Sequence, residues 1–597
     1  MNRRLFSFFI FFLQALSLFA QQSPKRELRG AWLTTFFNID WPVRSQSSQQ
    51  QKNALIDILN HHQATGINVI YMQVRSQCDA MYPSAIEPWS ADLTGTQGRA
   101  PSPFYDPLAF ALEECRKRNM EFHVWLNPYR AISSITNLNS FADNHIVKTQ
   151  PNWLLSSGNL RTLDPGIPDV RNYILSVIRD LVTRYDIDGV HFDDYFYPNG
   201  AFNDDQTFAN FGRGFTNRAD WRRDNINILI KDTYNTISAI KPWVKFGVSP
   251  SGIYRNSTNP AIGTPTAGLE HYSTLYADSK KWIQEGWVDY LIPQVYWHRG
   301  QNNADYSRIV PWWNNNSFNR HMYIGLAGYK VNDASQGSQW LQSSEIPNQV
   351  RLNRSVQNSN ITGQVIYNTA SMRSAANVAF RDSLRLNLYS KPSLLPTMPW
   401  KDNTAPAAPI ALVGNKFGTD SLVLTWTPPS ASVNEFDKVR AYVVYKSANP
   451  TIDSLSANEI VAIVSQPIYV DKQLFNGQNY IYKITALDRY QNESLASNTI
   501  STLSTSIDDI ISRPLVGVLV YPNPSSQQIT VQLYNQTANK ISITITDLQG
   551  KTVYKETFRR NTENNYTVNF GSNLTAGQYI VSVSGDNFQE QTKIIVL

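Results

Sequence analysis

The sequence is poor in cysteine and, after its first twenty residues, in long apolar runs. Its 597 residues include two cysteines; Cys115 stands in a helical pattern and Cys78 follows a strand pattern. We therefore expect two buried free thiols rather than a disulfide or a metal site. No later segment approaches the roughly 20 apolar residues that a membrane-spanning helix needs, so we expect no transmembrane segment in the mature protein.

Concentrated charge is also missing. The net charge of +6 is spread along the chain without a basic block, and this pattern gives no indication of nucleic-acid binding. No His-x-x-x-His or similar spacing points to a set of metal ligands. We expect neither a metal nor a cofactor.

The first twenty residues have the pattern of a secretory signal peptide. Arg3 and Arg4 precede the apolar run LFSFFIFFLQALSLFA, and Ala20 is a small residue at a suitable cleavage point. An uncleaved membrane anchor is the alternative. On the first interpretation the mature protein is exported.

From about residue 27 to 390, short apolar strand patterns alternate with polar loops and amphipathic helix patterns. Eight such units predict an α/β fold, a (β/α)₈ TIM barrel over residues 27–390; a doubly wound open sheet is the alternative. The predicted strands are RGAWLTT (29–35), NVIYMQV (68–74), EFHVWLN (121–127), GVHFDDY (189–195), KFGVSP (245–250), DYLIPQVY (289–296), HMYIGLAGY (321–329) and GQVIYN (363–368).

The remainder of the chain is of a different kind. Residues 391–408 form a proline-rich linker. Residues 409–503 contain short alternating runs such as SLVLTW and AYVVYK, which predict an all-β sandwich. A second polar linker leads to another all-β domain at 514–597.

Side chains within the predicted strands alternate between two faces. In the third strand Phe122, Val124 and Leu126 form an apolar face, which we expect to meet the helices, so the mixed face points into the barrel. The segment DIDGVHFDDY contains the fourth predicted strand and the three residues before it. The same rule applied to this strand directs Asp193 into the barrel mouth.

Polar and aromatic residues gather at the C-terminal ends of the predicted strands, where such barrels place their active sites. Side chains of these types suit sugar hydroxyls and sugar faces. The candidate substrate-binding residues are Gln73, Arg75, Asn127, Tyr129, Arg130, Tyr195, Ser249, Gln294, Tyr296, Trp297, Tyr329 and Asn368. Trp41, Trp89, Trp312 and Trp313 are candidate stacking platforms, with core packing as the alternative for each.

The barrel resembles glycosyl hydrolase-like family 10, also called domain of unknown function 187. The resemblance extends from the first to the sixth strand and implies an exported barrel glycosidase, with bacterial cell-wall glycan as a substrate of some members. The matching segments are RGAWLTT with NIDWP, NVIYMQVRSQCDAMYPS, HVWLNPYR, LDPGIPDVRNYI, RYDIDGVHFDDYFYP, FGVSPSGIYRN and YADSKKWIQEGWVDYLIPQVYW.

The two all-β domains also resemble known families. The middle domain, with Trp426, Tyr442, Tyr480, Tyr482 and ALDRYQNES, is similar to a fibronectin type III domain. The last domain, with YPNPSS, DLQGK, LTAGQYIV and KIIVL, resembles the C-terminal sorting domain of the type IX secretion system of Bacteroidota. This resemblance implies the type IX machinery as a partner, and secretion or attachment at the outer-membrane surface of a Gram-negative bacterium. A generic β-sandwich is the alternative for either domain.

Glycoside hydrolysis usually needs two carboxyl groups, about 5 to 5.5 Å apart for retention or about 6.5 to 9.5 Å for inversion. Asp193 is the first candidate, Asp194 is the preferred partner and Asp79 is the second choice. Arg75 or Arg130 could lower the pKa of a nearby carboxyl, whereas aromatic surroundings would raise it. A purely structural role for Asp193, as a buried partner of Arg75 or His191, stays open.

The fourth strand is partly similar to the signature of glycoside hydrolase family 18. Asp188 and Gly189 match it, and Asp193 matches the acid that orients an N-acetyl group. Tyr195, however, occupies the place of the glutamate acid. This departure argues against substrate-assisted cleavage.

The sequence thus predicts a secreted glycoside hydrolase that cleaves a polysaccharide by two-carboxylate chemistry, with the glycan strands of bacterial peptidoglycan as the first candidate substrate. Two alternatives belong to other classes. One is a non-catalytic cell-surface protein for glycan binding or adhesion. The other is a metal-dependent polysaccharide deacetylase, which would use His191 with Asp193 and Asp194.

Overall fold

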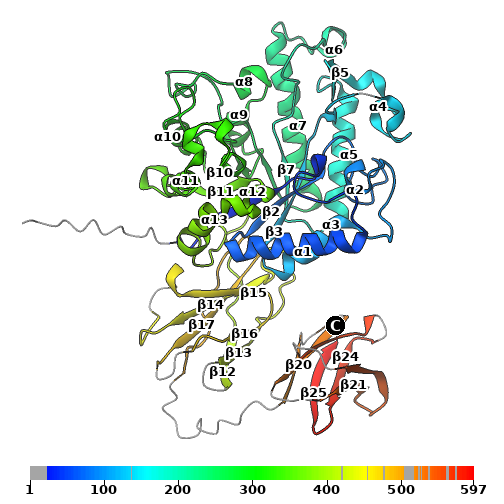
Figure 1. The fold of residues 1–597 in the computed structure, drawn as a ribbon, viewed down its shortest axis with the longest axis vertical. Helices are drawn as coiled ribbons and strands as arrows, with labels where there is room; N and C mark the ends of the chain where they lie inside the picture. Colours follow the sequence, from blue (N-terminus) through cyan, green and yellow to red (C-terminus); the bar gives the residue numbers. More distant parts are fainter. Residues whose placement is uncertain are drawn as a thin grey trace, which may run out of the picture.

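The computed structural model describes residues 23–502 and 517–596, apart from residue 136 and short gaps at 418–420, 453–454, 475–477, 522–524, 526, 535–537, 560–563 and 572–573. The predicted signal peptide lies outside these residues. An eight-stranded barrel surrounded by helices is followed by two domains made of antiparallel sheets (Figure 1).

The eight predicted strands close into a parallel barrel in the order β1-β11-β10-β9-β8-β7-β3-β2. The (β/α)₈ prediction is confirmed, and the open-sheet alternative is wrong. The strands are β1 (Leu28–Leu33), β2 (Val69–Arg75), β3 (Glu121–Leu126), β7 (Gly189–Phe192), β8 (Lys245–Val248), β9 (Tyr290–Leu291), β10 (His321–Ala327) and β11 (Ile361–Tyr367).

Capping residues mark the ends of the helices. Ser47 and Gln50 form a capping box at the start of α1 (Ser48–Thr65), which ends at Gly66 with φ +90°. Asp106 caps α3 (Pro107–Lys117). The other helices are α2 (Ala91–Thr94), α4 (Ile146–Thr149), α5 (Pro168–Arg184), α6 (Asp205–Phe211), α7 (Arg218–Ile240), α8 (His271–Thr274), α9 (Ser279–Gln284), α10 (Tyr306–Asn315), α11 (Glu345–Asn353), α12 (Thr369–Arg373) and α13 (Val378–Ser383).

The two faces of the barrel strands differ as predicted. Phe122, Val124 and Leu126 belong to the large core that includes the surrounding helices. Trp125 belongs to a separate inner cluster of strand residues, and His191 contacts Ser249 Oγ inside the barrel at 3.1 Å. The strand alternation used to orient the fourth strand is therefore confirmed.

A small antiparallel sheet interrupts the chain between β3 and α5. It consists of β4 (Arg130–Ile132), β5 (Leu154–Ser157) and β6 (Leu160–Leu163), in the order β4-β6-β5. Because β4 begins three residues after Asn127, which follows β3, the insertion lies at the C-terminal end of the barrel.

Each of the last two domains has one three-stranded and one four-stranded antiparallel sheet. The middle domain buries the four aromatic residues singled out in its sequence, in agreement with the predicted sandwich. Its strands are β12 (Ile410–Phe417), β13 (Ser421–Thr427), β14 (Ala441–Ser447), β15 (Ile460–Val464), β16 (Ile468–Asp471), β17 (Ile481–Leu487) and β18 (Ile500–Ser501); the last domain has β19 (Gly517–Tyr521), β20 (Gln528–Tyr534), β21 (Lys540–Asp547), β22 (Thr552–Arg559), β23 (Asn565–Asn569), β24 (Gly577–Ser584) and β25 (Gln589–Val596).

The two cysteines and the helices agree with the sequence. Cys78 and Cys115 are both buried free thiols, as predicted. Among the described residues, no helix combines the length and the apolar character needed to cross a membrane.

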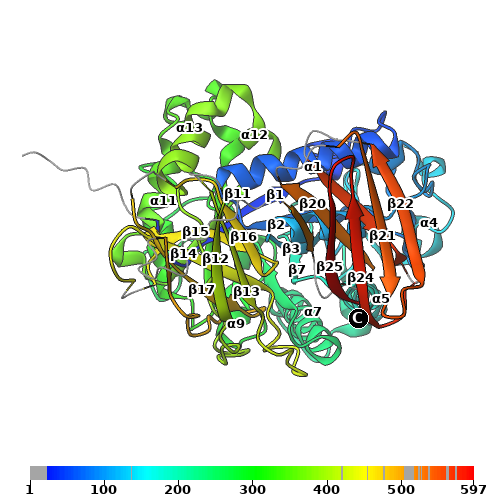
Figure 2. The ribbon, with the colours of Figure 1, turned by 90° about the horizontal axis from the view of Figure 1, so that it is seen from below.

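The proline-rich segment after the barrel packs against the N-terminal ends of the barrel strands. Leu394 and Met398 are buried there. Trp400 Nε1 donates a hydrogen bond to Asp289 at 2.9 Å, and Lys401 forms an ion pair with the same carboxylate at 3.2 Å. Seen from below, the middle domain lies in front of the barrel strands (Figure 2). The segment is thus a packed connection between the two domains.

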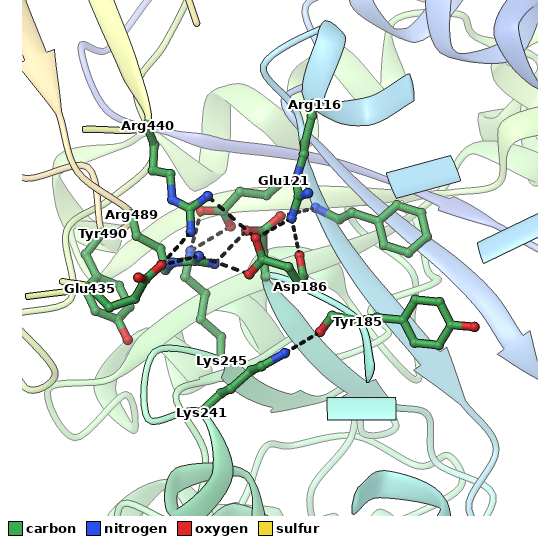
Figure 3. A network of polar contacts seen from close by, with 12 residues as sticks. Arg116, Glu121, Tyr185, Asp186, Lys241, Lys245, Glu435, Arg440, Arg489 and Tyr490 are labelled. Carbon is green, nitrogen blue, oxygen red and sulfur yellow. Dashed lines mark hydrogen bonds and ion pairs between the residues drawn. The ribbon is translucent and has the colours of Figure 1, made fainter. Parts of the chain in front are cut away.

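An ion network joins the middle domain to the lower end of the barrel (Figure 3). Arg489, which is almost fully buried, contacts Asp186 at 3.0 Å and Asp188 at 3.6 Å across the interface. Within its own domain it contacts Glu435 at 3.3 Å. Arg116 of α3 also pairs with Asp186, at 2.5 Å. Charges from both domains therefore share one network.

We expect Arg489→Met to destabilise the protein, because it removes the cation that contacts Asp186 and Asp188 across the interface. The loss should be at least about 1 kcal/mol, below the roughly 3–5 kcal/mol of a fully buried pair, since Asp186 is 38% exposed. Chemical unfolding measures this change. The control is Arg385→Met, whose pair with Asp382 is exposed and should contribute little. Equal stability of the two variants would contradict the role of the network.

Candidate active site

Asp193 follows β7 directly and lies in the barrel mouth. Its Oδ2 accepts hydrogen bonds from the Trp125 indole at 3.2 Å and from the Asn127 amide. Its Oδ1 accepts one from the Tyr195 backbone N–H at 3.3 Å. The residue is only 3% exposed. The carboxyl group is thus held by three neutral donors.

A chain of amides fixes the orientation of this acid. The backbone N–H of Phe36 donates to Gln73 Oε1 at 3.0 Å, and Gln73 Nε2 donates to Asn127 Oδ1 at 2.7 Å. The oxygen of Asn127 is thereby occupied, so its NH₂ group faces Asp193. Gln73 and Asn127, both predicted site residues, act together on one carboxyl group.

Asp194 lines a cavity of about 280 Å³ beside Asp193. Gln294 donates a hydrogen bond to its carboxylate and also to the backbone oxygen of Ser249, at 2.9 Å. The lining of the cavity combines polar side chains, among them Arg130, Asp194 and Gln294, with apolar ones such as Leu160 and Leu269. Such a mixture suits a sugar, which has hydroxyl edges and apolar faces.

Both acids are harder to ionise than ordinary aspartates. Burial raises the pKa of Asp193 to about 7; the positive charge of Arg130 opposes the shift and the negative charge of Asp194 adds to it. Burial likewise raises the pKa of Asp194 to about 6, against the hydrogen bond from Gln294. Near neutral pH the two neighbouring carboxyl groups therefore share about one proton.

The ion pair considered for Asp193 in the sequence is absent. Arg75 is buried and pairs with Glu87 at 2.7 Å. It also donates to the backbone oxygen of Pro128 at 3.1 Å. Its place is therefore beneath the mouth, where it supports the loop after β3.

Aromatic rings surround the two acids. The Arg130 guanidinium lies 4.2 Å from the Phe36 ring centre and 4.7 Å from that of Tyr195, which is half exposed. On another part of the rim, Tyr296 lies 5.8 Å from Tyr329 and 6.1 Å from Tyr367, in a stacked arrangement with the latter. Three predicted site residues, Tyr195, Tyr296 and Tyr329, thus contribute to this rim.

Phe36 and Tyr367 were missed in the sequence. Phe36 follows the first strand in TTFFN, and Tyr367 is the last residue of β11. Phe36 directly follows the predicted strand 29–35 and Tyr367 directly precedes the candidate Asn368, so including every aromatic residue next to a strand end would have found both.

Several other predicted site residues have structural partners. Tyr129 is fully buried and packs against Phe196 at 6.3 Å. Ser249 contacts His191 within the barrel, Trp297 is partly buried against the outer core, and Asn368 caps α12. Ligand contact by these four residues stays a prediction.

Asp79 and the four candidate tryptophans make structural contacts. Asp79 accepts hydrogen bonds from its own loop, from Ser76 Oγ at 3.3 Å and the Gln77 N–H at 3.1 Å. Among the four candidate stacking platforms, Trp41, Trp312 and Trp313 are buried in the core and Trp89 is partly buried against it. Core packing, the alternative considered for each of them, describes their positions.

A metal site finds no support in the described part of the chain, where no three His, Cys, Asp or Glu side chains converge. His191, the ligand considered for a deacetylase, contacts Ser249 and Tyr290 instead.

Two protein families match this chain. The family Glycosyl hydrolase-like 10 matches residues 27–342, and the family Secretion system C-terminal sorting domain matches residues 519–597. Glycosyl hydrolase YngK of Bacillus subtilis (strain 168) is 40% identical over 496 residues, which cover 81% of this chain and 95% of that protein. Glycosyl hydrolase DigH of Escherichia coli (strain K12) is 38% identical over 371 residues, with 58% and 84% covered.

Among solved structures, the PgaB (BpsB) glycoside hydrolase domain from Bordetella bronchiseptica aligns with 12% identity and a TM-score of 0.41, over 60% of this chain and 99% of that chain. The barrel and the two relatives together define a glycoside-hydrolase-like protein. The chain belongs to the Glycosyl hydrolase-like 10 family. Its last domain is a secretion-system sorting domain, which indicates a secreted or cell-surface protein.

The contact between Trp125 and Asp193 makes the titration of this acid observable without a substrate. Because the indole N–H donates to the carboxylate, we expect a change in tryptophan fluorescence as Asp193 ionises near pH 7. Asp193→Asn should remove this transition and Asp79→Asn should keep it. A wild-type titration that is identical to that of Asp193→Asn would contradict the raised pKa.

Proposed function

We propose that the protein is a secreted glycoside hydrolase that cleaves the glycan strands of bacterial peptidoglycan, with Asp193 and Asp194 as its catalytic acids. The observation that carries the proposal is the pair of neighbouring carboxyl groups at the C-terminal end of the barrel. Asp194 lines the cavity and Asp193 precedes it in the chain, and their raised pKa values of about 6 and about 7 leave one acid mainly protonated and the other mainly ionised between these values, which is what hydrolysis by two carboxyl groups requires.

The roles follow from the different surroundings of the two acids. Asp193, with the higher pKa, holds the proton and gives it to the leaving oxygen. Asp194, with the lower pKa and a hydrogen bond from Gln294, is ionised and acts at the anomeric carbon or on a water molecule. The amide chain through Asn127 keeps the donor in place.

The surroundings support a glycan as substrate. Tyr195 and Tyr329 are exposed aromatic side chains at the rim, and Gln294 and Arg130 add polar groups to the cavity. Sugars bind to such combinations through stacking and hydrogen bonds. The family, the relatives named glycosyl hydrolase and the sorting domain favour a cell-wall or environmental glycan outside the cytoplasm.

Purified protein incubated with peptidoglycan, isolated glycan strands and a panel of other polysaccharides tests the substrate directly. New reducing ends on the glycan strands are the expected result. Cleavage of another polysaccharide alone would change the substrate assignment. Binding without cleavage across the whole panel would favour the adhesion alternative.

Replacing either acid should abolish most of the cleavage. We expect Asp193→Asn and Asp194→Asn each to lower kcat/KM by about 100- to 10,000-fold, the usual contribution of a general acid or base. Asp79→Asn is the matched control, because Asp79 is engaged by its own loop. Thermal unfolding verifies that each variant folds. Undiminished cleavage by both active-site variants would refute their catalytic role.

The pH dependence should be bell-shaped with a narrow maximum. Above a pH of about 7 Asp193 loses the proton that it must donate, and below about 6 Asp194 becomes protonated, so kcat/KM falls on both sides. Gln294→Leu removes a donor that favours the ionised Asp194 and should move the acidic limb to higher pH. A profile that is flat from pH 5 to 8 would contradict this assignment.

A further inference from the structure

Arg130 has binding capacity that no described residue uses. It is only 6% exposed, and its Nε–H donates to the Ser76 backbone oxygen at 3.0 Å. Within the part of the chain that the structure describes, its two terminal nitrogens have no hydrogen bond and no ion pair. A guanidinium carries five N–H donors, so four of these donors have no partner among the described residues.

The two rings beside Arg130 determine which way these donors face. Phe36 and Tyr195 both lie within 4.7 Å of the guanidinium carbon and cover it by cation–π contact. The Nε edge is occupied by Ser76. The terminal edge therefore remains for a ligand, and a planar fork of this kind matches a carboxylate with two parallel hydrogen bonds.

Arg130 also lines the 280 Å³ cavity next to Asp194. Of the described residues that form this cavity, it is the sole cation, and Thr162, Asn199 and Gln294 add neutral polar groups. Its charge lowers the pKa of both acids through space, but it forms no ion pair with either of them, so its terminal N–H groups stay available for a ligand.

We infer that Arg130 binds a carboxylate carried by the sugar that occupies this cavity, so that the substrate is an acidic glycan. The inference rests on the proposed function for the location of the sugar. Two kinds of sugar supply the required group: an amino sugar with a free lactyl ether, and a uronic acid. Leu160 and Leu269 line the same cavity and offer apolar contacts for the sugar ring.

The test compares matched glycans. One is a set of peptide-free peptidoglycan strands with free lactyl carboxylates, and the other is the same strands after reduction of these groups to alcohols. Binding is measured calorimetrically in the Asp193→Asn background, where the strands stay intact. We expect the acidic strands to bind about 10- to 100-fold more tightly, the range for a hydrogen bond to a charged group, and Arg130→Met to bring this ratio close to 1.

Arg130→Lys keeps the positive charge but not the planar guanidinium, so it should retain only part of the preference for acidic over reduced strands. This variant replaces Arg130→Met in the test if Arg130→Met does not fold. Equal binding of the acidic and reduced strands, or an unchanged ratio in both Arg130 variants, would overturn the inference. A preference that appears with an oligouronide and not with the lactyl strands would support it and identify the uronic acid as the source.

Cleavage by the wild-type protein is scored separately. Selective binding without cleavage would refute the proposed hydrolase while supporting the role of Arg130. Cleavage of acidic and reduced strands at equal rates, with equal binding, would support the proposed hydrolase and refute the role of Arg130.

Discussion

The arrangement of the barrel mouth depends on one constraint, the burial of Asp193 without an ion-pair partner. An ionised carboxylate in that position is unfavourable, so its pKa rises to about 7. A nearby arginine in direct contact would have cancelled the shift. Instead, Arg75 is held by Glu87 and Arg130 by Ser76 and two aromatic rings, which keeps both cations out of contact with the acid.

The two ends of the barrel treat charge in opposite ways. At the N-terminal end each buried charge has a partner, as Lys245 has in Glu121, Lys401 in Asp289 and Arg489 in Asp186. The first of these pairs lies within the barrel, the second joins the linker to it and the third joins the middle domain to it. At the C-terminal end Arg75 pairs with Glu87, whereas Asp193, Asp194 and Arg130 form no ion pair with any described residue. A barrel that must position reactive groups precisely at one end gains from a rigid, fully paired base at the other.

Much of this organisation could be predicted from the sequence because it follows from local periodicity. The eight strands were visible as apolar runs, and alternation within EFHVWLN was enough to orient Asp193. Contacts between distant segments were not accessible in the same way. Nothing local shows that Phe36 would meet Arg130, or that Trp41 and Trp313 would be buried while Tyr195 is exposed, because these outcomes depend on how loops fold over one another.

Two adjacent residues on a strand face opposite sides, so Asp193 and Asp194 could not serve one site if β7 continued through them. The strand ends at Phe192. Beyond it, the Tyr195 N–H bonds to the Asp193 side chain and the Phe196 N–H bonds to the Asp194 backbone oxygen at 3.0 Å, so the chain turns. The turn removes the alternation, and this allows the second acid to line the cavity next to the first. The chemistry of the site thus depends on where the strand stops as much as on which way it faces.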